Sequence, residues 1–181
     1  MKVFIGCASS NNIPKIYYDE CKKLIDKLLV NNDFLYGAYN EGLMGICFNT
    51  AKKYNRKITG VAPKEYKNDL ELIDCDNKVL TDSIIDRTKT LLYESDVIVI
   101  LPGGIGTINE LFSSIDSKRS NEFDKPIIIY NVNHYYDDLI KFLDRLYNEK
   151  FTSREVENCY YVTDSIDKVI EYLNKRGNNN G

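Results

Sequence analysis

The sequence predicts a single α/β domain with a Rossmann-like, doubly wound sheet of about seven mainly parallel strands. Three observations favour this fold. The chain has 181 residues, which suits one domain with a substantial core. Short apolar runs alternate with longer amphipathic segments, as expected of repeated strand–helix units. The runs 97–101 and 127–130 are continuously apolar, which is typical of strands buried on both faces of a parallel sheet.

Seven short apolar runs are the expected strands. In chain order they cover residues 2–6, 34–37, 57–61, 78–80, 96–101, 126–131 and 160–162. Helical patterns predict helices at residues 13–31, 42–54, 82–94, 107–120, 135–148 and 165–175. The domain is expected to span residues 1–176. The tail 177–181, GNNNG, has nothing to bury and is expected to be frayed.

Composition and charge exclude several classes of protein. Lys and Arg number 24 against 27 Asp and Glu, which gives a formal net charge of −3. We therefore expect neither a nucleic-acid binder nor a binder of anionic membranes, both of which need a basic excess. No stretch approaches the roughly 20 apolar residues of a membrane span, and the apolar run after Met1 is too short for a signal peptide. A cytoplasmic location is the simplest expectation.

The five cysteines and the single histidine argue against metal and Ser-His-Asp chemistry. The cysteines are scattered, no two form a CxxC pair, and their number is odd. We therefore expect neither a zinc site nor an iron–sulfur cluster, and no fully paired disulfide framework. His134 would have to serve in any catalytic triad, but it lies at an apparent helix start, where a capping or surface role is the simpler interpretation.

The most informative segment is the glycine loop at residues 101–110, LPGGIGTINE, between a predicted strand and a predicted helix. Sheets of this type bind ligands beyond the C-terminal ends of their strands. Glycines let the backbone approach a ligand closely, and the N–H groups at a helix start favour an anion such as phosphate. The loop lacks the Lys of a Walker A motif and the GxGxxG spacing. It therefore implies neither nucleoside-triphosphate hydrolysis nor a dinucleotide fold.

Two interpretations of the residues around this loop remain open. Thr107 and Glu110 have the spacing of a capping box, which on spacing alone is the simpler interpretation. If a phosphate instead satisfies the first N–H groups, Glu110 is free to face the ligand one turn into the helix. Arg87 lies on one flank of the apolar stripe of helix 82–94. From there it can reach the end of the sheet, or it can remain a solvated surface residue.

These residues together resemble the LOG ("lonely guy") family of cytokinin riboside 5′-monophosphate phosphoribohydrolases, long misannotated as lysine decarboxylases. The family signature PGGxGTxxE matches residues 102–110 in full. Arg87 stands nine residues before Asp96, as the family Arg stands before its Ser-Asp pair. Four shorter segments also resemble segments of the family, namely residues 6–10, 42–45 (GLMG), 125–126 and 131–137. The resemblance covers nearly the whole chain.

The resemblance implies a nucleotide-binding domain that hydrolyses the N-glycosidic bond of a nucleoside 5′-monophosphate. The substrate would be AMP or an N6-modified AMP, and the products a free base and ribose 5-phosphate. Arg87 and Glu110 would be the catalytic pair, with the carboxylate near the cationic sugar and the guanidinium holding it in place. No metal or cofactor is implied. The implied substrate-binding residues are Asp69, Thr88, Gly103, Gly104, Ile105, Gly106 and Thr107.

Several positions depart from the family pattern. Thr88 replaces a Lys, residues 38–41 (AYNE) replace part of a glycine run, and Ile84 and Ile85 replace Met and His. The chain also has no Trp. These changes fall around the expected sugar and base rather than on the phosphate loop. They therefore bear on base specificity more than on cleavage of the glycosidic bond.

Two non-catalytic functions compete with the enzyme. One is a nucleotide or molybdenum-cofactor carrier of the same fold, and the other is a regulatory sensor whose dimer responds to a bound nucleotide. Retention of both Arg87 and Glu110 favours the enzyme, because a carrier needs the loop but not the carboxylate. The resemblance also implies a homodimer or larger homo-oligomer.

Overall fold

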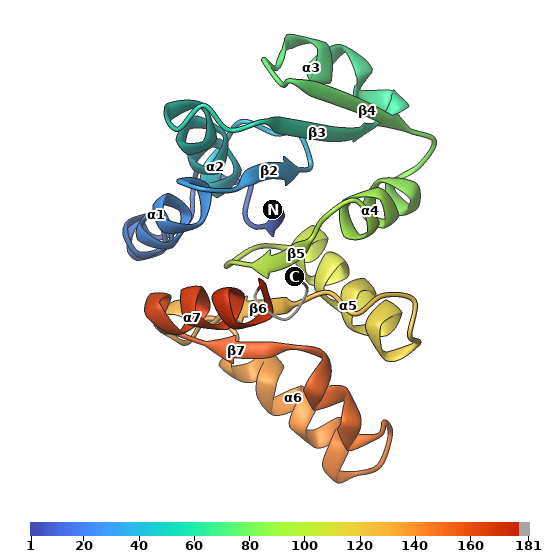
Figure 1. The fold of residues 1–181 in the computed structure, drawn as a ribbon. Coiled ribbons are helices and arrows are strands. Elements are labelled where there is room, and N and C mark those ends of the chain that lie inside the picture. Colours follow the sequence, from blue (N-terminus) through green and yellow to red (C-terminus); the bar gives the residue numbers. More distant parts are fainter. Residues whose placement is uncertain (178–181) are drawn as a thin grey trace.

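The computed structural model describes residues 1–177 and contains a seven-stranded parallel sheet with helices on both faces (Figure 1). The strand order is β4-β3-β2-β1-β5-β6-β7, and every neighbouring pair is parallel. The Rossmann-like, doubly wound fold is therefore confirmed. The strands are β1 (Lys2–Gly6), β2 (Asp33–Tyr36), β3 (Ile58–Pro63), β4 (Asn77–Thr81), β5 (Val97–Ile100), β6 (Ile127–Tyr130) and β7 (Tyr161–Thr163).

Helices cover both faces of the sheet (Figure 1). One layer contains α1 (Lys15–Leu29), α2 (Gly42–Lys53) and α7 (Ile166–Gly177). The other contains α4 (Ile84–Tyr93), α5 (Ile105–Arg119) and α6 (Asp137–Asn148). Short 3₁₀ turns, η2 (Val132–His134) and η3 (Arg154–Cys159), lead into α6 and β7. Residues 178–181 of the predicted frayed tail lie outside the described residues, and Gly177 is the last residue of α7.

The sheet separates two apolar cores, which explains the continuously apolar central strands. Along β5, Val97 and Val99 pack with α1, α2 and α7, whereas Ile98 and Ile100 pack with α4, α5 and α6. Because successive side chains of a strand point to opposite faces, a strand covered on both faces has to be apolar at every position.

The loops after three strands converge at the carboxyl edge of the sheet. β1 lies between β2 and β5, which is the point where the strand order reverses. In the loop after β1, the N–H of Ala8 donates to the carbonyl of Pro102 after β5, at 3.0 Å. The carbonyl of Ala8 accepts from the N–H of Leu43, at the start of α2, at 2.9 Å. Backbone hydrogen bonds therefore connect the loop after β1 both to the loop after β5 and to the start of α2 at this edge of the sheet.

The structure differs from the sequence prediction in two segments near this edge. Between the predicted strands 57–61 and 78–80, where no helix is predicted, the structure contains the end of β3, the 3₁₀ turn η1 (Lys64–Tyr66) and the helix α3 (Lys67–Leu72). Helix α3 is too short to show a helical period, and it forms because Leu70 is buried in a small apolar cluster. The apolar stripe of α4 is buried only in part, since Ile84 and Ile85 are 51% and 79% exposed.

Candidate active site

The glycine loop joins β5 to α5 and forms the start of that helix. Helix α5 begins at Ile105. Its N-cap residue is Gly104, so no side chain caps the first N–H groups of the helix. The capping-box interpretation is therefore wrong, because Thr107 lies inside the helix and Glu110 bonds to Arg87 instead of reaching back. The first N–H groups of α5 have no intrahelical acceptor and lie at the positive end of the helix dipole, where they can bind an anion.

The glycines of the loop serve different purposes. At Gly103 an added Cβ would lie 2.2 Å from Oγ1 of Thr107, so packing against α5 excludes a side chain there. At Gly104 and Gly106 an added Cβ would have no atom from another part of the described chain within 4 Å, and neither residue has a positive φ. Packing in the protein therefore does not require glycine at these two positions. Their lack of a side chain keeps the start of α5 open to close approach by a ligand.

Arg87 reaches from α4 across the ends of β3 and β2 to α5. Its Nη1 donates to Oε1 of Glu110 at 3.3 Å, and its Nε donates to the carbonyl of Val61 at 3.2 Å. The guanidinium lies against Gly37, where an added Cβ would fall 1.4 Å from Nη2. Only 14% of the Arg87 side chain is exposed. The alternative of a solvated surface arginine is therefore wrong.

Glu110 is a buried carboxyl group beside the switch point of the sheet. It is 3% exposed, and its Oε2 has no hydrogen-bond partner among the described residues. The side chain lies against Gly6 at the end of β1, where an added Cβ would be 3.0 Å from Oε2. Burial raises the pKa of the Glu110 carboxyl to about 7, and the Arg87 guanidinium opposes part of this rise. The carboxyl group can therefore exchange a proton near neutral pH.

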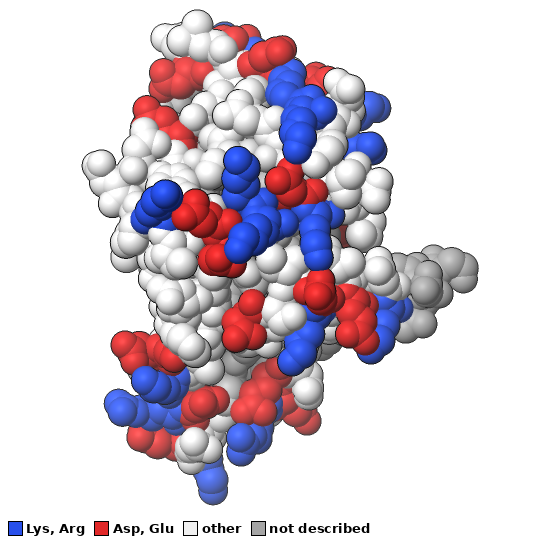
Figure 2. Space-filling view, turned by 90° about the vertical axis from the view of Figure 1, so that its left-hand side faces the viewer, with Lys and Arg blue, Asp and Glu red and all other residues white. Residues whose placement is uncertain are grey.

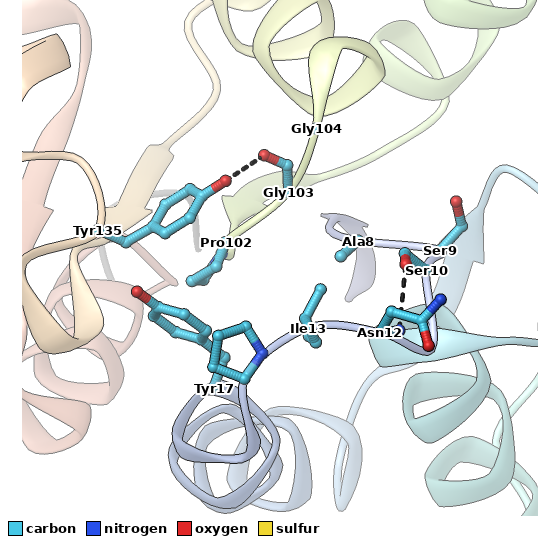
Figure 3. A pocket seen from close by; sticks show the side chains of 11 residues that line it. Ala8, Ser9, Ser10, Asn12, Ile13, Tyr17, Pro102, Gly103, Gly104 and Tyr135 are labelled. Carbon is cyan, nitrogen blue, oxygen red and sulfur yellow. Dashed lines mark hydrogen bonds between the residues drawn. The ribbon is translucent and has the colours of Figure 1, made fainter.

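Two clefts open at this edge of the sheet, and Ser9 in the loop after β1 lines both. The first cleft has a volume of about 340 Å³ and is lined by Arg87 and Asp69, among others. The second has a volume of about 370 Å³ and is lined by Gly103 and Gly104 on one side. Tyr17 and Tyr135 also line the second cleft, and the Tyr135 hydroxyl points to the Gly103 carbonyl (Figure 3).

The predicted site residues do not all meet in one place. Asp69 is exposed on α3 and lines the same cleft as Arg87. Thr88 is buried on α4 and lines a groove of about 290 Å³ that also contains residues of α5, so the structure does not bring it beside Asp69. Ile105 is 87% exposed at the start of α5. The His134 side chain is 77% exposed, which agrees with a surface role.

Sequence reasoning missed three groups that shape the site. The carbonyl of Val61 carries no sequence signal, because every residue has one. Gly37 ends the predicted strand 34–37, and its closeness to Arg87 depends on the tertiary structure. The Tyr135 hydroxyl donates to the carbonyl of Gly103, which lies 32 residues earlier in the chain. No local spacing could indicate that contact.

The protein surface shows no single-sign charge over α1, α2 and α7, because basic and acidic side chains are interspersed on this face (Figure 2). Some form ion pairs between helices, such as Lys27 with Asp167 at 2.7 Å and Lys53 with Asp26 at 3.1 Å. Within residues 1–177, no helix has the length and apolar character needed to cross a membrane. The same part of the chain contains no group of three or more His, Cys, Asp or Glu side chains that could hold a metal ion.

Comparisons with known proteins agree with this geometry. A family model described as "Possible lysine decarboxylase" matches residues 44–173. A probable cytokinin riboside 5′-monophosphate phosphoribohydrolase of Oryza sativa subsp. japonica is 29% identical over 174 residues, which cover 95% of this chain and 71% of that protein. A cytokinin riboside 5′-monophosphate phosphoribohydrolase of Arabidopsis thaliana is 26% identical over 95% of this chain and 82% of its own length.

Solved structures with the same fold include two molybdenum cofactor proteins. The molybdenum cofactor binding protein of Rippkaea orientalis has a TM-score of 0.71 at 19% identity, covering 96% of this chain and 95% of that chain. The Moco carrier protein of Chlamydomonas reinhardtii has a TM-score of 0.69 at 16% identity with the same coverage. At such low identity these likenesses establish the fold alone. Because the family model matches most of the chain and the signature at residues 102–110 is complete, the protein belongs to the family described as possible lysine decarboxylase, the LOG family.

Proposed function

We propose that the protein hydrolyses the N-glycosidic bond of a nucleoside 5′-monophosphate, AMP or an N6-modified AMP, to a free base and ribose 5-phosphate. The observation that carries the proposal is the pair of Arg87 and Glu110 beside the glycine loop. A buried carboxyl group with one oxygen unpartnered among the described residues is unfavourable in a purely structural role. In a hydrolase of this class the unpartnered oxygen is the atom expected to accept a hydrogen bond from the reacting sugar or water once substrate is bound.

Binding of the substrate begins at the phosphate. The N–H groups at the start of α5, from Gly104 to Thr107, bind the 5′-phosphate through the dipole end of the helix. Glu110 lies one turn further along α5, about 4.5 Å along the helix axis from Thr107. The ribose of a nucleotide held at the loop can therefore extend over the carboxyl group. The cleft that contains Arg87 and Asp69 is available to the base.

The chemical step breaks the bond between C1′ of the ribose and the base nitrogen. As the bond breaks, the sugar develops positive charge, and the ionised carboxylate of the buried Glu110 stabilises that charge. A water molecule supplies a hydroxyl to C1′ and a proton to the departing base. Glu110 is able to carry that proton in transit, because its pKa of about 7 lies close to neutral pH. Arg87 keeps the carboxyl group oriented throughout.

The experiment is a panel of nucleoside monophosphates incubated with the protein, with the released bases separated by chromatography. Free adenine is expected from AMP or from an N6-modified AMP. The variant Glu110→Gln is expected to abolish release while binding of the monophosphate stays within a few-fold. The matched control is Glu155→Gln, which makes the same change at an exposed glutamate on η3.

Two outcomes contradict the proposal. If no monophosphate yields a free base but nucleotides still bind, the protein is a nucleotide-binding or carrier protein. If Glu110→Gln retains full turnover, Glu110 is a structural residue and the assignment of the catalytic pair is wrong.

A further inference from the structure

We infer that Tyr135 is a positioning residue for the phosphate site, acting through the backbone of the glycine loop. The Tyr135 hydroxyl donates a hydrogen bond of 2.7 Å to the carbonyl of Gly103 (Figure 3). This inference rests on the proposed function, since it concerns how the same loop binds a phosphate.

The loop is held by its carbonyl groups. Four consecutive carbonyls accept hydrogen bonds from groups outside the loop or from within α5. The Tyr136 hydroxyl donates to the Leu101 carbonyl at 2.7 Å, and the Ala8 N–H donates to the Pro102 carbonyl at 3.0 Å. The Tyr135 hydroxyl donates to the Gly103 carbonyl at 2.7 Å, and the Ile108 N–H donates to the Gly104 carbonyl at 3.0 Å. The carbonyl side of the loop is therefore fully engaged, and its N–H groups are the side that remains for a ligand.

The bond to Gly103 determines the direction of one particular N–H group. A peptide unit is planar and trans, so its carbonyl and its N–H point in opposite directions. When Tyr135 holds the Gly103 carbonyl, it also aims the N–H of Gly104, the N-cap residue of α5. Two adjacent glycines rotate easily about the peptide between them. Without the hydroxyl, this peptide can turn its carbonyl toward the ligand and repel a phosphate.

The neighbouring tyrosine provides a matched control within the same loop. Tyr136 donates a hydrogen bond of the same length to the Leu101 carbonyl. The peptide that it holds joins Leu101 to Pro102, and proline has no N–H to aim. Removal of the Tyr136 hydroxyl therefore takes away an equivalent bond without changing the direction of any N–H group. Tyr17, which meets the Tyr135 ring edge to face at 5.3 Å, offers a second control in the same cleft.

The test compares wild type with Tyr135→Phe, Tyr136→Phe and Tyr17→Phe. Binding of AMP and of inorganic phosphate is measured by calorimetry, and KM and kcat for AMP are measured where turnover is present. Tyr135→Phe is expected to weaken both binding reactions and to raise KM by roughly five- to tenfold, the effect of one ordinary hydrogen bond. Its kcat is expected to stay within about twofold of wild type, and both controls are expected to keep phosphate affinity within about twofold.

The outcomes separate this inference from the proposed function. If wild type binds AMP and phosphate but releases no base, the proposed hydrolysis fails, and the loss of binding in Tyr135→Phe still supports the role of Tyr135. Equal binding in wild type and Tyr135→Phe would overturn that role. The same loss in Tyr136→Phe, in step with a lower melting temperature, would also overturn it and indicate general loosening of the loop. Failure of wild type to bind either compound would overturn both.

Discussion

The buried carboxyl group of Glu110 makes a quantitative prediction about stability as a function of pH. The side chain is 3% exposed, and its pKa in the folded protein is about 7 against an ordinary value of 4.5. Since the folded-state pKa is raised, the neutral carboxyl group favours folding. That contribution is fully present below about pH 4.5 and is lost as the pH rises through about 7. At about 1.4 kcal/mol per pH unit, the loss amounts to about 3 kcal/mol.

The variant Glu110→Gln tests this value, because glutamine keeps the shape of the side chain and cannot ionise. From about pH 5 to about pH 8, the stability of the variant relative to wild type is expected to rise by 2 to 3 kcal/mol, roughly the part of the loss that falls in this range. The assay is urea unfolding of both proteins at several pH values, followed by circular dichroism. Taking the difference cancels the titration of the other carboxyl groups, provided that they are independent of this site.

The control is again Glu155→Gln, whose stability relative to wild type is expected to stay nearly constant across the same pH range, since the side chain is exposed. Parallel pH profiles for wild type and Glu110→Gln would refute the reasoning. They would mean that the Arg87 guanidinium compensates fully for the burial of the ionised carboxyl group, and that Glu110 is ionised throughout this range.

Three further predictions concern turnover and assembly. Gly37→Ala is expected to displace the Arg87 guanidinium from Glu110 and to lower kcat/KM about a hundredfold. The fold is expected to be kept, because the end of the flexible Arg87 side chain can move. Unchanged turnover with an unchanged melting temperature would refute this. In wild type, kcat/KM for AMP is expected to fall as the pH drops below about 7, because Glu110 acts in its ionised form. A flat pH–rate profile from about pH 5 to 8 would exclude that role. We propose that the homodimer implied by the family resemblance forms through the α4–α5 side. Ile85→Glu, at a 79% exposed position, is then expected to shift the mass measured by light scattering toward the monomer, and Leu72→Glu, at an 87% exposed position on α3, is expected to leave it unchanged. An unchanged mass for Ile85→Glu would refute this interface.

The order of strands and helices could be predicted because it depends on local patterns. The runs that became β5 and β6 are apolar at every position, and the helix between them opens on the glycine loop. Local patterns were less informative where tertiary contacts decide the structure. The predicted helix 135–148 begins instead at Asp137, after a 3₁₀ turn in which Asn133 and His134 have positive φ angles. Asn131 stabilises this start by bonding Tyr136 N and the Asp137 side chain.

Local residue patterns were enough to predict the fold class, the position of the glycine loop and the candidacy of Arg87 and Glu110. They left open whether Glu110 capped a helix and whether Arg87 was a surface residue, since both alternatives have the same local spacing. Contacts between distant segments of the folded chain resolve both alternatives. The strand order β3-β2-β1-β5 brings the start of α4 and the start of α5 to one edge of the sheet, where Arg87 reaches across Gly37 to Glu110. The burial of Glu110, its raised pKa and the hydrogen bond from Tyr135 to Gly103 all arise from such contacts between distant segments. No local pattern of residues indicates them.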